Sequence, residues 1–255
     1  MVDLSRWLAA LGAGLAMAAS QAAPLAYEPV GLAWSAGEVE RVTAAQHATL
    51  VERAQRAQQL GCLSHCERLA SVFQRLLGEA RLQTRRSADL PWGLNVLRLP
   101  DVEAQALPGG HVVISESFID QHALSDPALA FVLAHEMAHV ILEHERQALS
   151  FALLLLPRQV VRSVRDMYVE MDYSLSLLKR MEPVMHQGEF EADELGLLMA
   201  SAAGYDPDLQ LAYLEQECRA DTGRPGLVAT HPPACARLNA LKALLPLARR
   251  QRVDG

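Results

Sequence analysis

Apolar positions recur at helical spacing along most of this chain. Residues 38–60 are rich in Ala, Gln, Arg and Glu, a composition typical of a helix. Residues 62–82 predict a second helix whose apolar side chains share one face: Leu63, Leu69, Val72, Phe73, Leu76 and Leu77. Residues 188–203 and 233–250 have patterns of the same kind. The spacing of apolar residues therefore predicts a mainly helical protein.

Two short segments between these helices have the pattern of β-strands instead. Residues 94–99 alternate in part, with apolar side chains at Leu94, Val96 and Leu97. Residues 111–114 contain three β-branched residues, Val112, Val113 and Ile114, and follow the turn formed by residues 108–110, which read Pro-Gly-Gly. We therefore expect an α+β fold that is mainly α, with a small sheet.

A strongly apolar helix is predicted for residues 125–144. Asp126 is expected to cap its start, and Pro127 suits its first helical position. Apolar residues occupy nearly the whole circumference of this helix: Leu129, Phe131, Val132, Leu133, Val140, Ile141 and Leu142. A helix that is apolar on all sides is normally buried in a protein core.

The segment that follows contains a second apolar run, residues 148–156, which ends at Pro157. This run is too short to cross a bilayer, because a spanning helix needs about 20 apolar residues. We expect it to lie in the core. A lid over a site, or a peripheral contact with a membrane surface through residues 148–156, is the alternative.

Composition and charge limit the classes of protein to consider. Half of the residues are hydrophobic (51%), which is enough for one sizeable core. The net charge is −7, so the chain lacks the excess of basic residues that is typical of a nucleic-acid-binding protein. We expect no nucleic acid among its partners.

The N-terminus has the pattern of a signal peptide. Arg6 precedes an apolar stretch at residues 7–19, and Ser20 and Ala22 form a plausible cleavage pair. We expect residues 1–22 to be removed on export, with the bacterial periplasm as the destination, and residues 23–255 to form one domain. An uncleaved membrane anchor in residues 7–22 is the alternative.

Four cysteines remain after this cleavage. An even number of cysteines in an oxidising compartment favours disulfides, and three pairings are possible. We favour the pairing closest in sequence, Cys62 with Cys66 and Cys218 with Cys235. The spacing of the first pair, with no second close pair, is poor for a zinc site built from cysteines.

The sequence His135-Glu136-Met137-Ala138-His139 lies within the apolar helix. Residues four apart share one helix face, so the two imidazoles can converge on one tetrahedral zinc ion. Glu136 lies beside them and can take a proton from an attacking water molecule. Burying two histidines and a glutamate inside an apolar helix costs folding free energy unless these side chains bind a partner such as a metal ion.

A catalytic zinc site needs a third protein ligand in addition to the two histidines. The richest supply is the acidic segment at residues 189–194, where Glu189 and Asp193 lie on one helix face. One of these carboxylates can bind the metal while the other accepts a hydrogen bond from an imidazole. Glu191 points elsewhere and is expected in solvent. Glu143 and His144 are rival ligands, although His144 lies more than a turn beyond the histidine pair.

These motifs resemble a known family. H-E-x-x-H followed about fifty residues later by E-x-x-A-D is similar to the zinc metallopeptidases that include the CAAX prenyl proteases, HtpX and the periplasmic BepA-like proteases. Three further segments match: residues 106–113 (ALPGGHVV), residues 203–207 (AGYDP), and Thr230-His231-Pro232 with Arg237. The resemblance covers about residues 38–248.

This resemblance implies a zincin-like metallopeptidase domain with a small sheet beside the H-E-x-x-H helix. It implies Zn²⁺ bound by His135, His139 and Glu189, with Glu136 as the general base. Asp193 and Arg237 are expected behind the ligands.

The resemblance also implies a position for His231, which would face the metal. There it would either support catalysis by stabilising an oxyanion or latch the open metal position. The strand at residues 111–115 is expected to be the sheet edge that pairs with substrate.

The resemblance implies an exported zinc endopeptidase acting on polypeptides, among them envelope proteins under quality control. A latent protease that serves mainly as a chaperone or assembly factor for envelope proteins is the alternative.

Overall fold

A computed structural model describes residues 31–220 and 231–254 of the chain. The predicted signal peptide at residues 1–22 and Thr230 of the C-terminal motif lie outside the described residues.

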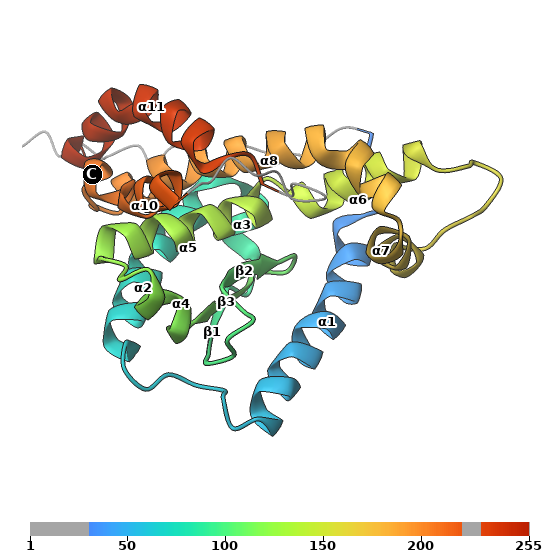
Figure 1. Cartoon of the computed structure of the whole chain (residues 1–255), viewed down its shortest axis with the longest axis horizontal. Helices are drawn as coiled ribbons and strands as arrows, with labels where there is room; N and C mark the ends of the chain where they lie inside the picture. The colour runs from blue at the N-terminus through green and yellow to red at the C-terminus, as the bar shows by residue number, and fades with distance from the viewer. Residues whose placement is uncertain (1–30, 221–230, 255) are drawn as a thin grey trace, which may run out of the picture.

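Helices make up most of the described chain (Figure 1). They are α1 (Ala36–Arg56), α2 (Cys66–Gln83), α3 (Arg85–Asp89), α4 (Glu116–Gln121), α5 (Asp126–Ile141), α6 (His144–Leu155), α7 (Val164–Tyr173), α8 (Leu175–Ala202), α9 (Pro207–Gln210), α10 (Ala212–Ala220) and α11 (Ala234–Asp254). The strands are β1 (Gly93–Leu97), β2 (Ala104–Leu107) and β3 (His111–Ser115). This architecture confirms the predicted α+β class with a small sheet. Within the described residues, no helix has both the length and the apolar character needed to cross a bilayer.

The sheet has the order β1-β3-β2, with β1 parallel and β2 antiparallel to β3. The prediction that residues 111–115 form the sheet edge is therefore wrong. Val112, Val113 and Ile114 are fully buried, as expected of a strand with neighbours on both sides. The edge strand is β2, whose residues are only partly buried.

The turn between β2 and β3 depends on its glycines. Gly109 and Gly110 both have positive φ angles, of 99° and 84°, a conformation that other residues rarely adopt. A Cβ atom at position 110 would also lie 3.3 Å from the Trp92 main chain. The turn predicted from Pro108-Gly109-Gly110 is confirmed, and it brings the edge strand back beside α5.

Helix α5 runs through the middle of the main hydrophobic core, as predicted. It packs against α2, α8 and the sheet. The expected cap at Asp126 is wrong, because the Ser125 hydroxyl accepts the hydrogen bond from the Ala128 N–H. Asp126 is the first helical residue, and its carboxylate pairs with Arg68.

Helices α5 and α8 approach each other very closely at Gly196. A Cβ atom on this residue would lie 2.9 Å from the His135 main-chain nitrogen and 3.0 Å from its Cα. Real Cβ atoms essentially never make contacts as short as the first of these. Only glycine therefore allows α8 to lie this close to the start of the H-E-x-x-H motif.

A second hydrophobic cluster lies between α6, α7, α8 and α1. Leu149 and Ala152 of α6 are fully buried in it, so the apolar run at residues 148–156 belongs mainly to a core, as its first interpretation predicted. Leu154 is an exception, because its side chain is exposed to solvent.

Both disulfides form in the pairing favoured from the sequence. Cys62 is bonded to Cys66, the first residue of α2, and Cys218 in α10 is bonded to Cys235 in α11. The second bridge joins the two helices on either side of residues 221–230.

Candidate metal centre

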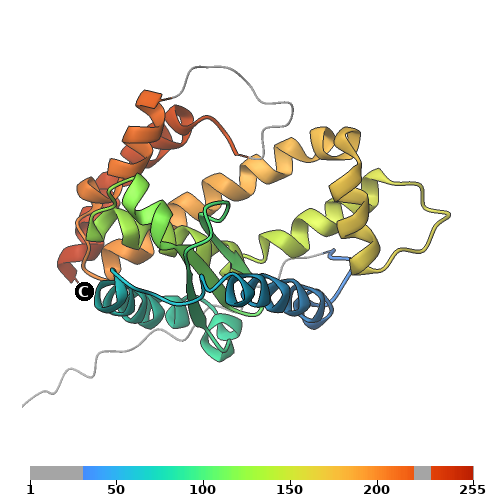
Figure 2. The same cartoon turned by 60° about the horizontal axis from the view of Figure 1, so that its bottom comes forward.

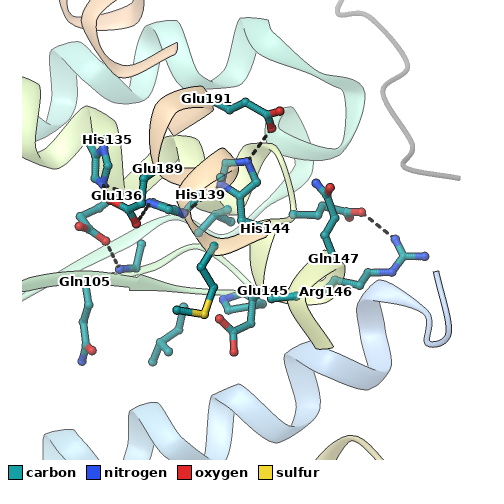
Figure 3. A pocket seen from close by; sticks show the side chains of 18 of the residues that line it. Gln105, His135, Glu136, His139, His144, Glu145, Arg146, Gln147, Glu189 and Glu191 are labelled. Carbon is teal, nitrogen blue, oxygen red and sulfur yellow. Dashed lines mark hydrogen bonds and ion pairs between the residues drawn. The ribbon is translucent and has the colours of Figure 1, made fainter. Parts of the chain in front are cut away.

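Three side chains from two helices converge beside the sheet (Figure 3). His135 and His139 lie one turn apart on α5, and their Nε2 atoms are 3.1 Å apart. Glu189 of α8 faces both rings, with carboxylate oxygens 3.6 Å from the His135 Nε2 and 3.4 Å from the His139 Nε2. One potential ligand atom from each residue lies within 4.8 Å of the other two. This convergence depends on the close approach of α5 and α8 at Gly196.

The environment of Glu189 fits a bound cation. Its side chain is almost completely buried, and its Oε2 atom accepts no hydrogen bond from the described residues. Burial alone raises the pKa of Glu189. The hydrogen bond from His139 and the charges of His135 and His139 outweigh burial and hold that pKa at about 2. A buried, ionised carboxylate beside two imidazoles is the donor set that a tetrahedral zinc ion prefers, with a fourth position left for water or substrate.

Asp193 and Arg237 support these groups from behind. The Asp193 Oδ1 lies 3.0 Å from the His135 Nδ1, so this carboxylate can hold the proton on Nδ1 and leave Nε2 free toward the centre. Arg237 of α11 donates two hydrogen bonds to Asp193, of 2.7 and 2.6 Å, and its Nη1 lies 3.3 Å from Glu189. Burial raises the pKa of Asp193, but these partners lower it further than burial raises it.

His144 supports the other ligand ring. Its Nδ1 lies 3.0 Å from the His139 Nδ1, and its Nε2 lies 3.2 Å from Glu191 Oε2 (Figure 3). Burial and the neighbouring His139 lower the pKa of His144 to about 4, so its ring is neutral at pH 7. His144 therefore contacts the expected metal ligand His139 and is not itself one of the three converging residues. Glu191, expected in solvent, is only partly exposed and is bound to this ring.

The sequence did not reveal this arrangement because α5 ends at Ile141. Glu143 has a left-handed backbone (φ 57°), and α6 begins at His144 in a new direction. Helical spacing therefore does not predict how His139 of α5 and His144 of α6 lie relative to each other. Glu143, the other rival ligand, is paired with Arg86 and Arg146 instead.

Glu136 lies between the ligands and the sheet. Its Oε2 accepts a hydrogen bond of 2.9 Å from the Ala106 N–H of the edge strand β2. This bond orients the carboxylate beside the two imidazoles (Figure 3). Sequence spacing placed Glu136 next to the site, but the contact with β2 depends on the tertiary fold.

His231 precedes α11, and its side chain is largely exposed. The Nε2 atom lies 3.6 Å from Glu189 Oε1. The bridge between Cys218 and Cys235 anchors the chain four residues after His231. The structure thus brings His231 to the edge of the three converging side chains.

Two hollows flank the converging side chains. One of about 470 Å³ extends from His139 and Glu136 along β2 toward α1 and is also lined by Val39, Val184 and Met185. The other, of about 480 Å³, lies on the His135 side beside Tyr213. Glu136, Ala104 and His231 border both hollows. A continuous surface therefore passes across the site along the edge strand.

The family model described as peptidase family M48 matches residues 64–245 of the chain. The mitochondrial metalloendopeptidase OMA1 of Schizosaccharomyces pombe is 30% identical over 171 residues, which are 65% of this chain and 50% of the relative. OMA1 of Saccharomyces cerevisiae is 31% identical, over 62% of this chain and 48% of the relative. The beta-barrel assembly-enhancing protease of Escherichia coli is 24% identical, over 67% and 38%. The matched region spans half or less of each of these relatives.

Proposed function

Because this chain belongs to peptidase family M48, we propose that it is a zinc-dependent endopeptidase that hydrolyses internal peptide bonds of polypeptides. The observation that carries this proposal is the convergence of His135, His139 and Glu189, with Glu136 held beside them. These are the ligand types and the base that peptide hydrolysis on zinc requires.

The three converging residues would hold Zn²⁺, which supplies a Lewis acid for the peptide carbonyl and lowers the pKa of water. Glu136 would accept the proton of the attacking water and pass it to the leaving amine. The Ala106 N–H fixes the carboxylate of Glu136 in place for these transfers. Asp193 and Arg237 would keep the His135 ring oriented.

The substrate would lie along β2. This strand pairs with β3 on one side, and Gln105, Ala106 and Leu107 line the hollow on the His139 side. An extended peptide can add to such an edge by main-chain hydrogen bonds, which bind a chain without reading its sequence. This mode of binding suits an endopeptidase that acts on unfolded segments.

We further propose that the protein is exported to the periplasm and acts on misfolded or misassembled envelope proteins. Two disulfides support an oxidising compartment. The name of the Escherichia coli relative, a beta-barrel assembly-enhancing protease, supports an envelope role. The signal-peptide pattern at residues 1–22 is the remaining support.

A second function is supported by the position of His231. Its ring lies at the edge of the ligand set and can occupy the open metal position, which would make the enzyme latent. A latent enzyme of this kind could act mainly as a chaperone or assembly factor.

Metal analysis together with a casein-type proteolysis assay tests the main proposal. We expect about one zinc per chain, proteolysis that a chelator abolishes, and recovery on adding zinc. Glu189→Ala should lose the metal, whereas Glu191→Ala, a matched change two residues away on the same helix, should retain it.

Stoichiometric zinc in Glu189→Ala would remove this residue from the ligand set. A zinc-loaded protein that cleaves no unfolded substrate would favour the chaperone alternative.

A further inference from the structure

The hollow on the His139 side of the metal centre contains an acidic side chain that the proposed mechanism does not use. Glu145, the second residue of α6, lines this hollow together with residues of α1, β2, α5 and α8. Figure 3 shows the Glu145 carboxylate pointing away from His139 and His144, with no dashed line to another residue drawn. Figure 2 shows α1, in blue, lying alongside the sheet, so this hollow lies where a peptide on β2 would pass.

Acidic groups outnumber basic groups in the lining of this hollow. Five glutamates and two arginines contribute to it: Glu136, Glu143, Glu145, Glu189 and Glu191, with Arg86 and Arg146. Both arginines are already paired. Arg86 contacts Glu40 and Glu143, and Arg146 contacts Glu143 as well. The hollow therefore has no cation to spare for its other carboxylates.

Three of the remaining four glutamates have a partner or a role. Glu136 and Glu189 belong to the metal centre, and Glu191 is bonded to His144 and Gln187. Glu145 differs from them, because it forms no ion pair with any residue that the structure describes. Its charge is therefore the one in this lining that nothing in the described chain compensates.

The surroundings of Glu145 favour a cation beside it. Its side chain is only partly exposed, and burial raises its pKa, an effect that the neighbouring Tyr168 hydroxyl opposes. The hydroxyl is neutral and cannot balance a negative charge. A carboxylate held away from water is costly unless an opposite charge meets it, and a cation from a ligand would favour its ionised form.

The walls next to Glu145 are apolar. Val39, Ala148, Val184 and Met185 line the same hollow, and all four belong to the second hydrophobic cluster or pack against it. Walls of this kind suit the methylene chain of a lysine or arginine, whose charged head then needs an acceptor. A long basic side chain thus matches both parts of this surface.

We propose that Glu145 binds the charged head of a lysine or arginine side chain of the substrate and so determines specificity. This inference rests on the proposed endopeptidase function. Main-chain hydrogen bonds to β2 hold the peptide without reading its sequence, whereas Glu145 selects the side chain that enters the hollow on the His139 side. A neutral polar side chain is a poorer occupant, because it leaves the charge of Glu145 uncompensated, as Tyr168 does.

Paired peptide substrates test this inference. Quenched fluorescent peptides of one sequence carry either lysine or norleucine at a single position, which is moved along both sides of the cleaved bond. Norleucine has the methylene chain of lysine without the ammonium group, so the pair isolates the charge. We expect one position at which kcat/KM is about 10–100-fold higher for lysine, the gain from one hydrogen bond between charged groups.

Variants of Glu145 should change this ratio. Glu145→Gln should bring the ratio of lysine to norleucine at that position close to one, because an amide carries no charge. Glu145→Lys should reverse the preference, so that a glutamate peptide is cleaved faster than the lysine peptide. Glu194→Gln is the matched control, since Glu194 is exposed on α8 and lines neither hollow. It should retain the wild-type ratio.

A binding measurement makes the test independent of cleavage. In the zinc-loaded Glu136→Gln protein, fluorescence anisotropy should show about 10–100-fold tighter binding of the lysine peptide, and adding Glu145→Gln should abolish the difference. Equal binding of the two peptides at every position would overturn the role of Glu145. A lysine preference that survives Glu145→Gln would overturn it as well. Failure of the proposed function would instead appear as wild-type protein that cleaves none of the peptides, whatever their order of binding.

Discussion

The Nδ1 atom of His144 lies 3.0 Å from the Nδ1 atom of His139, on the side of that ring facing away from Glu189. If His139 Nε2 binds metal, the proton of His139 lies on Nδ1 and is donated to His144. The neutral His144 ring can then donate its own proton from Nε2 to Glu191. The ring and the carboxylate thus fix the tautomer and orientation of one ligand.

Removal of this support should weaken the metal site without abolishing it. We expect His144→Ala to lower zinc affinity about 10–100-fold, because the His139 ring loses the partner that orients it. Competition with a chromophoric chelator measures this affinity directly. His65→Ala, which removes a histidine paired with Asp120 far from the centre, should leave the affinity unchanged. Unchanged affinity in both variants would show that the contact is incidental.

The role proposed for Glu136 separates binding from chemistry. Glu136→Gln should retain zinc and the native fold while losing about 10²–10⁴-fold in proteolysis, because an amide cannot accept the water proton. Metal content and the rate of casein cleavage, measured on one preparation, check both halves of this expectation. Cleavage at the wild-type rate would exclude Glu136 as the base.

His231 distinguishes two models of regulation. In the latch model, His231→Ala frees the open metal position and raises basal proteolysis. In the oxyanion model, the same change lowers proteolysis by about 10²-fold or more. We expect the rate to rise, because the His231 ring lies at the edge of the ligand set, where it can cover the open metal position. An unchanged rate would make His231 an ordinary surface residue in spite of its distance of 3.6 Å from Glu189.

The close approach of α8 to α5 predicts a large effect from a single methyl group. Gly196→Ala should destabilise the protein by about 1–3 kcal/mol and lower zinc affinity, because α8 and Glu189 must shift away from His135. Gly78→Ala is the control, since a Cβ atom there meets nothing within 4 Å; it should stabilise α2 by about 0.5–1 kcal/mol. Urea unfolding of the two variants checks the contrast, and equal stabilities would contradict the close approach.

Glu116 gives a prediction about pH. Its buried carboxylate accepts main-chain hydrogen bonds from Leu63, Ser64 and His65 just before α2. Burial raises the pKa of Glu116, but these hydrogen bonds lower it below the usual value. The ionised form is therefore favoured by folding, and its contribution is present above the unfolded pKa near 4.5 and is lost as pH falls through the lower folded value.

Glu116→Gln should accordingly cost about 1–3 kcal/mol at pH 7, since at least one N–H loses its acceptor. The difference in the free energy of unfolding between wild type and variant should shrink below pH 4. Urea titrations at the two pH values measure this change. A difference that does not vary with pH would mean that the charge of Glu116 contributes nothing to stability.

Helical spacing was sufficient to group the candidate ligands on two helix faces, and the family resemblance then implied Glu189 rather than Asp193 as the third ligand. His135 and His139 share a face of α5, and Glu189 and Asp193 share a face of α8, because both segments are long and regular. The prediction failed where regular structure ends. Nothing in the sequence marked the left-handed residue Glu143, so the new direction of α6 and the role of His144 were not foreseen.

The sheet edge was missed for a different reason. The sequence of β2, Ala-Gln-Ala-Leu, has none of the β-branched residues by which strands are recognised, whereas β3 has three. Strand β2 forms because the turn at Gly109 and Gly110 folds it back against β3. Its Ala106 N–H then meets Glu136, a contact that only the assembled fold determines.

One helix carries both an expected metal ligand and the residue that sets its distance from α5. Glu189 and Gly196 are seven residues apart on α8, about two helical turns, so they lie on one face of that helix. A movement of α8 away from α5 would therefore disturb the metal centre and the core packing at the same time. Metal binding is for this reason expected to be thermodynamically linked to the stability of the whole fold.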